Sequence, residues 1–151
     1  MMLHILGALL LPLCGWLAGD AVQARTEQHL AALRSSLALL ERIRQEIAFR
    51  RADLQQLYAE LCQEGMLTKG APCLQKIPPP QGLTRAEQQC FRECLSGLGR
   101  TEAKQECERL DYYRARLQTM QAQAELAARR QAGLPHKLGM AAGMAAALLL
   151  I

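Results

Sequence analysis

The sequence predicts an all-α protein, a hairpin-like helical bundle of long antiparallel helices with one membrane helix at each end. Aromatic residues make up only 4% of the 151 residues, whereas Ala, Leu, Gln, Arg and Glu, which favour helices, dominate the middle. All 18 Lys and Arg residues lie between Arg25 and Lys137, so neither end carries a basic residue. This distribution indicates that the ends and the middle meet different solvents.

Residues 1–19 form the first uncharged segment. As a helix this segment would be about 28 Å long, close to the ~30 Å hydrocarbon thickness of a bilayer, so we expect a transmembrane helix. A cleaved signal peptide is the alternative, since Val22 and Ala24 precede a suitable cleavage point in "DAVQAR". A lipoprotein site at Cys14 is disfavoured because the bulky Leu13 precedes it.

Residues 138–151 form the second segment and contain no charge and no hydroxyl group. A helix here would rise only about 21 Å, but it lacks the polar stripe of a surface helix, so we expect a short membrane helix. The two segments share a small-residue spacing that favours helix packing in lipid. The predicted packing residues are Gly15, Gly19, Gly139 and Gly143.

Basic residues flank both segments on their inner side, with Arg25 after the first and Lys137 before the second. The positive-inside rule therefore predicts a multi-pass protein whose central domain, residues 20–137, lies in the cytosol.

The central domain begins with a heptad pattern that predicts one long amphipathic helix, or two helices that meet near Ala52. The positions of the seam are Leu30, Leu33, Leu37, Leu40, Ile47, Leu54 and Leu61. A proline-rich loop follows at about residues 66–83, with the stiff run Pro78, Pro79 and Pro80.

Helix is expected to restart at Thr84, because Glu87 follows it in capping-box spacing. After a break at "SGLG", Thr101 is placed to cap the last helix. That helix carries a second heptad seam and ends before Gly133 and Pro135. The second seam consists of Leu110, Tyr113, Leu117, Met120, Ala124 and Ala127. Antiparallel packing of the two seams predicts the hairpin.

The sequence carries no pattern typical of an enzyme or of a cofactor site. Cys90 and Cys94 lie one helical turn apart and would need Cys107 or Cys62 to hold zinc, but no C-x-x-C pair is present, so free thiols are expected. The three histidines are scattered and no phosphate-binding loop follows a strand, so we predict no catalytic residue, no metal and no cofactor. Basic residues alternate with Glu, which indicates a solvated surface rather than a nucleic-acid interface.

Several segments, in order along the chain, resemble stage III sporulation protein AB. They are "LGALLL" near the start, "SLALLERIRQEIAF", the turn "LGRTEAKQE" and the final "LGMAAGMAAALLLI". The residues that match the family turn are Leu98, Gly99, Thr101 and Glu102, and those that match the first-helix pattern are Leu40, Glu46 and Ile47. Two features depart from the family pattern. Asp53 replaces a proline before Leu54, and the loop "KIPPPQG" is unusual.

The resemblance implies a component of the channel complex between mother cell and forespore, located in the membrane around the forespore. It also implies similarity to the helical cytoplasmic domain of type II secretion F proteins, which are membrane platforms. The expected partners are the ATPase stage III sporulation protein AA and other components of the complex, and self-association is left open.

The expected function is therefore a scaffold that docks a cytosolic ATPase, with the exposed basic pair Arg50 and Arg51 as candidate docking residues. The alternative is an envelope coiled coil with a cleaved signal, one C-terminal anchor and disulfides. A zinc-dependent interaction module is a third hypothesis.

Overall fold

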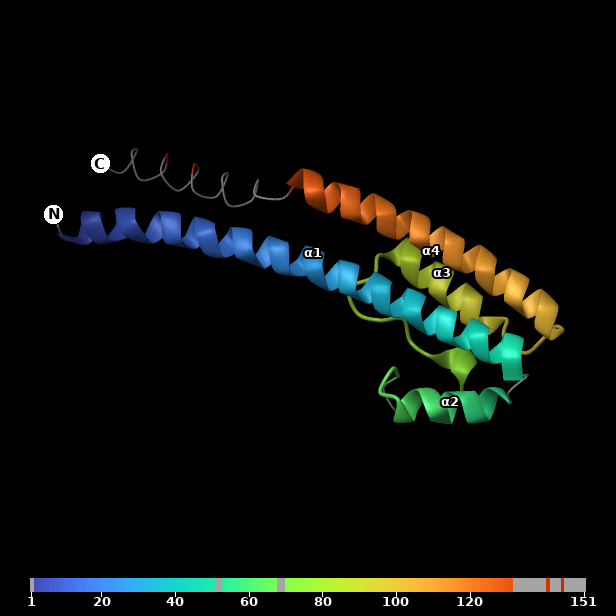
Figure 1. Ribbon diagram of the computed structural model, residues 1–151. Coiled ribbons are helices and arrows are strands. Elements are labelled where there is room, and N and C mark those ends of the chain that lie inside the picture. Colours follow the sequence, from blue (N-terminus) through green and yellow to red (C-terminus); the bar gives the residue numbers. More distant parts are fainter. Residues whose placement is uncertain (1, 51–52, 68–69, 132–140, 142–144, 146–151) are drawn as a thin grey trace. The chain divides into compact units, whose positions relative to one another are not determined.

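The computed structural model describes residues 2–50, 53–67, 70–131, 141 and 145; among these, the side chains of residues 2–16, 18, 50 and 131 are not described. The described residues form four α-helices and one short 3-10 helix, with no strand among them, which confirms the all-α prediction (Figure 1). In chain order the elements are α1 (Met2–Arg50), α2 (Leu54–Gln63), η1 (Leu74–Lys76), α3 (Arg85–Ser96) and α4 (Ala103–Gln131). The chain divides into two compact units, His29–Gln123 and the two ends, Met1–Gln28 with Ala124–Ile151.

Helix α1 includes the predicted first membrane segment and the start of the first arm in one unbroken helix. Residues 20–50 contain neither Gly nor Pro, so no residue there interrupts the helix. Among the residues that the structure describes, no helix is both long and apolar enough to cross a membrane. The predicted span 1–19 has most of its side chains outside this set, and the predicted span 138–151 lies outside it except for residues 141 and 145. Both spans stay predictions.

The first heptad segment is divided into two helices, α1 and α2. Helix α1 ends at Arg50, and α2 begins at Leu54 with Asp53 as its N-cap. The Asp53 carboxylate accepts a hydrogen bond from the Gln55 backbone N–H at 3.2 Å. The prediction of two helices that meet near Ala52 is confirmed, and Asp53 caps the second helix.

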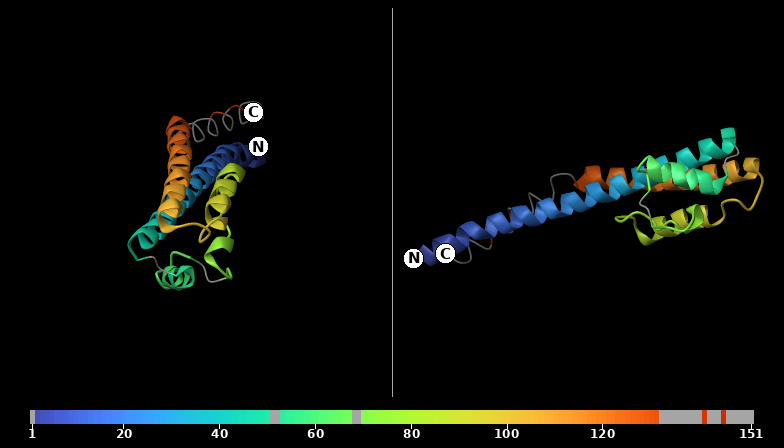
Figure 2. Two further views of the ribbon diagram at one scale, coloured as in Figure 1. Left: turned by 90° about the vertical axis from the view of Figure 1, so that its right-hand side faces the viewer. Right: turned by 90° about the horizontal axis from the view of Figure 1, so that it is seen from below.

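Helices α1 and α4 run antiparallel within residues 29–123, as the two seams predict (Figures 1 and 2). Two ion pairs fix the register: Glu41 with Arg114 at 2.7 Å, and Arg44 with Asp111 at 2.6 Å. Helix α3 packs beside both and completes a three-helix core, and α2 lies outside it (Figure 2). The fully buried side chains of this core include Leu33, Leu40, Ile43, Phe91, Leu95, Leu110 and Leu117.

The seams are only partly buried. Leu30, Leu37, Tyr113 and Met120 are half-buried, and Ala127 is exposed. Leu37 and Tyr113 lie inside their seams, so a heptad pattern marks the side of a helix that faces its partners without ensuring that every position on that side is fully buried.

The proline-rich segment is anchored to the bundle at three buried side chains, Leu74, Ile77 and Leu83. Leu74 lies in η1, which packs against α2 and α3. Pro78, between two of these anchors, is exposed. The segment is a fixed connector that returns the chain to the start of α3.

The predicted capping box at the start of α3 is present. The Thr84 hydroxyl accepts a hydrogen bond from the Glu87 N–H at 3.5 Å, and the Glu87 carboxylate accepts one from the Thr84 N–H at 2.7 Å. The same carboxylate, buried in the bundle, accepts a hydrogen bond from Nε2 of His29 on α1, with 2.9 Å to its nearer oxygen.

Candidate docking site at the turn before α4

The turn between α3 and α4, residues 97–102, depends on Gly97, the buried Leu98 and Gly99. Leu98 is buried, and Gly99 adopts φ +80°, a left-handed conformation that favours glycine. A Cβ at position 99 would lie 2.6 Å from Cδ1 of Leu54, the first residue of α2. The turn therefore has both a backbone conformation and a close packing contact that only glycine satisfies.

Glu106 holds this turn against the first turn of α4. Its side chain is buried, and Oε1 accepts hydrogen bonds from the Arg100 N–H at 3.2 Å, the Thr101 N–H at 3.2 Å and the Thr101 hydroxyl at 2.9 Å. Thr101 thus bonds the Glu106 side chain, and α4 begins at Ala103. The expectation that Thr101 caps the last helix is wrong. Helix α4 begins at Ala103, so Glu102 and not Thr101 precedes its first residue, and the Thr101 hydroxyl donates to the Glu106 carboxylate instead.

Arg109 supplies the positive charge that pairs with the Glu106 carboxylate. Its Nη2 donates to Oε2 of Glu106 at 2.9 Å, and its Nη1 donates to the Glu93 carbonyl in α3 at 3.4 Å. Burial would raise the pKa of Glu106, but hydrogen bonds from Arg109 and Thr101 and the charge of Arg109 outweigh burial and hold that pKa below its ordinary value. The carboxylate is therefore charged at neutral pH and part of the frame.

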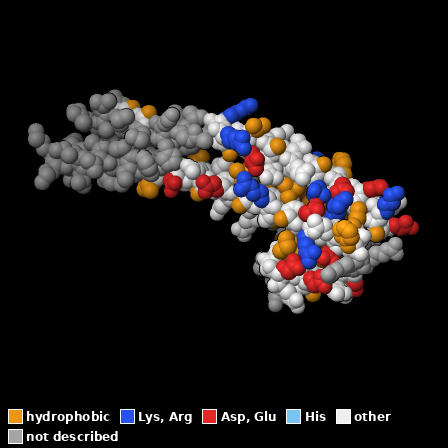
Figure 3. Space-filling view, in the orientation of Figure 1, with side chains coloured by type: hydrophobic (Ala, Val, Ile, Leu, Met, Phe, Trp, Pro, Cys, Tyr) orange, Lys and Arg blue, Asp and Glu red, His pale blue; other side chains and the backbone are white. Residues whose placement is uncertain are grey.

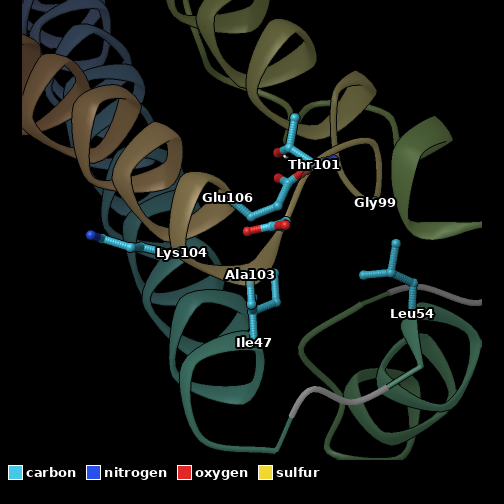
Figure 4. A pocket seen from close by; sticks show the side chains of 8 residues that line it. Ile47, Leu54, Gly99, Thr101, Ala103, Lys104 and Glu106 are labelled. Atoms are coloured by element: carbon cyan, nitrogen blue, oxygen red, sulfur yellow. Dashed lines mark hydrogen bonds between the residues drawn. The ribbon is translucent and has the colours of Figure 1, made fainter.

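An open hollow of about 610 Å³ lies beside this turn, where α1, α2 and the start of α4 meet. The residues that line this turn hollow are Ile47, Leu54, Gly99, Thr101, Glu102, Ala103, Lys104 and Glu106. Figure 4 shows Ile47 and Ala103 on one side, Leu54 facing them, the bonded Thr101 and Glu106 at the top, and Lys104 extending away. Leu54 and Ile47 supply apolar surface, and the exposed Glu102 and Lys104 supply charge of both signs.

Three residues of the family turn and one residue of the first-helix pattern therefore meet here. Gly99, Thr101 and Glu102 line the turn hollow, and so does Ile47 from α1. Leu40 and Glu46 are buried on α1, where Glu46 pairs with Arg42. About fifty residues separate Ile47 from the family turn in the sequence, so only the fold brings them together.

The candidate docking residues Arg50 and Arg51 cannot be placed relative to the turn hollow. Arg50 is the last residue of α1 and its side chain is not described, and Arg51 lies outside the described residues. Of the predicted packing glycines, Gly19 is buried in its unit, and Gly139 and Gly143 lie outside the described residues. Gly15 belongs to α1, in the stretch whose side chains are not described.

The five cysteines whose side chains the structure describes are free thiols, as expected from the sequence. Cys90 and Cys94 are buried, and Cys62, Cys73 and Cys107 are half-buried. Burial raises the pKa of Cys94 to about 12 and also raises that of Cys90, so both thiols are protonated at neutral pH. No group of three His, Cys, Asp or Glu side chains that could hold a metal ion occurs in the described part of the chain.

The sequence analysis did not find Glu106 or Arg109, which hold the turn, and it marked Gly97 only as part of the break "SGLG". Glu106 follows Thr101 by five residues, outside the capping-box spacing, so no local rule marks it. Figure 3 shows both signs of charge interspersed on the visible face of the described residues, which agrees with a solvated helical surface.

One family model, described as stage III sporulation protein AB (spore_III_AB), matches residues 71–151. The matched range includes α3, the family turn, α4 and the C-terminal apolar segment. No curated protein and no solved structure matches the chain.

Proposed function

This chain belongs to the stage III sporulation protein AB family, and from this premise we propose that it is a non-enzymatic membrane platform that docks the ATPase stage III sporulation protein AA. Membership gives a role in stage III sporulation. The platform, its membrane helices at residues 1–19 and 138–151 and its cytosolic partner are the proposed refinements.

The observation that carries the proposal is the position of the family turn beside the turn hollow. Leu98, Gly99 and Thr101 stabilise the turn. Glu102 is exposed beside the apolar surface of Leu54. A rigid, partly apolar hollow with charges at its edge is typical of a surface that receives a side chain from a partner. We therefore propose the turn hollow as the docking site for the ATPase. Arg50 and Arg51, which lie between Ile47 and Leu54 in the sequence, are proposed as further contacts.

A site-specific crosslinking experiment tests the docking proposal. A photoreactive amino acid is placed at Glu102 or at Lys104 of the full chain, which is expressed with the ATPase in cells. Crosslinks to the ATPase are expected from both positions. Gln89, exposed on α3, serves as the matched control. Crosslinking from position 89 as strong as from 102 and 104, or none from any of the three, would exclude the turn hollow as the docking site.

The mass of the mature N-terminus tests the membrane topology. The platform requires that residues 1–24 are retained, because they contain the first proposed span. A mature chain that starts at Arg25 would instead support the envelope coiled coil.

A further inference from the structure

Three exposed arginines lie in the unit formed by the two ends of the chain. Arg25 belongs to α1, and Arg129 and Arg130 belong to the last turn of α4. None of the three forms an ion pair with another residue that the structure describes. Their guanidinium groups are open to a ligand from outside the described chain.

The arginines on the α1–α4 seam of the bundle behave differently. Arg44 binds Asp111, and Arg114 binds Glu41, so their charge is neutralised within the chain. These pairs also give the register, in which each step forward along α1 matches a step backward along α4. Arg25 and Arg130 belong to the other unit, where both are exposed.

The charge around these arginines becomes more positive toward the C-terminus. From Leu126 to the end, the sequence contains Arg129, Arg130 and Lys137 and no acidic residue, and beyond Lys137 it is wholly apolar. The acidic Glu27 in the same unit already accepts a hydrogen bond from Gln23 at 3.2 Å. The unit also contains Asp20 on α1, which is exposed, and Glu125 on α4, which lies before Leu126. In the sequence, Arg129 and Arg130 therefore stand between the last acidic residue and the apolar segment.

We infer that Arg25, Arg129 and Arg130 bind the phosphate groups of anionic phospholipids where the chain meets the membrane. The guanidinium group has the planar, bidentate geometry that phosphate oxygens match. Each basic side chain near an anionic bilayer surface strengthens binding by about fivefold. The inference rests on the proposed membrane attachment and adds a lipid preference to it.

The test uses the full chain reconstituted into vesicles of phosphatidylcholine alone or with phosphatidylglycerol. Flotation of the vesicles reports attachment, and hydrogen–deuterium exchange of residues 124–131 reports contact with the lipid surface. We expect exchange there to be several-fold slower with phosphatidylglycerol, by up to about fivefold for each arginine, and the difference to disappear in high salt.

The variant Arg129→Gln with Arg130→Gln should lose most of this lipid dependence. The matched control, Arg85→Gln with Arg92→Gln, removes two exposed arginines from α3 and should retain it. Circular dichroism checks that both variants keep their helix. Flotation with both vesicle types but no effect of phosphatidylglycerol would overturn the lipid preference and leave the platform intact. A chain that floats with neither vesicle type would overturn the membrane attachment and the inference with it.

Discussion

The guanidinium of Arg109 lies over Gly97, in the space that any side chain at position 97 would occupy. A Cβ there would lie 2.1 Å from Nη1 and 2.7 Å from Cζ of Arg109. From this position Arg109 reaches both the Glu106 carboxylate and the Glu93 carbonyl. The absence of a side chain at position 97 therefore allows the ion pair that stabilises the turn.

Substitution of Gly97 by Ala should lower the free energy of unfolding by about 1–3 kcal/mol, because the displaced guanidinium leaves the buried Glu106 without its cation. Urea denaturation of the full chain in detergent measures this. Gly70→Ala is the matched control, since nothing lies within 4 Å of a Cβ at that position. Equal stability of the two variants would show that Arg109 finds an equivalent position at no cost.

Substitution of Gly99 by Ala should combine two penalties, the left-handed backbone and the 2.6 Å contact with Leu54. Gly65→Ala isolates the first, because Gly65 has φ +73° with open space around its Cβ, and it should cost about 1–2 kcal/mol. Gly99→Ala should cost measurably more than Gly65→Ala in the same denaturation experiment. In a chain that already carries Leu54→Ala, the further change Gly99→Ala should cost no more than Gly65→Ala does. If it still costs more, the additional penalty comes from another contact.

Glu106→Gln should lower the free energy of unfolding by roughly 1–3 kcal/mol at pH 7, because the amide cannot accept all of the hydrogen bonds that the carboxylate accepts. The pKa of Glu106 is lower in the folded than in the unfolded chain, so the unfolded chain binds more protons as the pH falls. The stability that Glu106 contributes is complete above about pH 5 and is lost as the pH falls through its folded pKa.

The difference between the wild-type chain and Glu106→Gln should therefore shrink as the pH falls below about 5, in denaturation measured at several pH values. Glu108→Gln, exposed on the same helix, is the control and should stay within about 0.5 kcal/mol of the wild type throughout. A difference that does not depend on pH would mean that Glu106 acts through packing alone.

Cys94 should be the slowest of the described thiols to react with an alkylating reagent at pH 8. With a pKa of about 12, its thiolate fraction is about three orders of magnitude below that of an ordinary thiol, and burial slows access further. Mass spectrometry of the native chain should show Cys62, Cys73 and Cys107 modified before Cys90 and Cys94. All five should react alike in urea, and early modification of Cys94 in the native chain would indicate that the bundle opens readily.

Much of the fold follows from local rules of sequence. The capping box at Thr84 and the break before Leu54 depend on spacings of a few residues, which the sequence shows directly. The antiparallel seams follow from the heptads, although several of their positions, such as Leu37 and Tyr113, are less buried than the pattern suggests. The short helix η1 was not predicted, because the burial of Leu74 depends on the distant helices that surround it.

The candidate site depends on contacts that local rules do not describe. Ile47, Leu54 and Thr101 belong to three separate segments, and they meet because α1 ends where α4 begins. Thr101 was expected to cap the last helix, but α4 begins two residues later, and the Thr101 hydroxyl bonds to the buried carboxylate of Glu106.

The carboxylate of Glu87 closes the capping box of α3 and also receives the hydrogen bond from His29 of α1. Because one side chain serves both purposes, fraying of the start of α3 would also break its bond to His29. We therefore expect the backbone amides at the start of α3 and around His29 to exchange with solvent together.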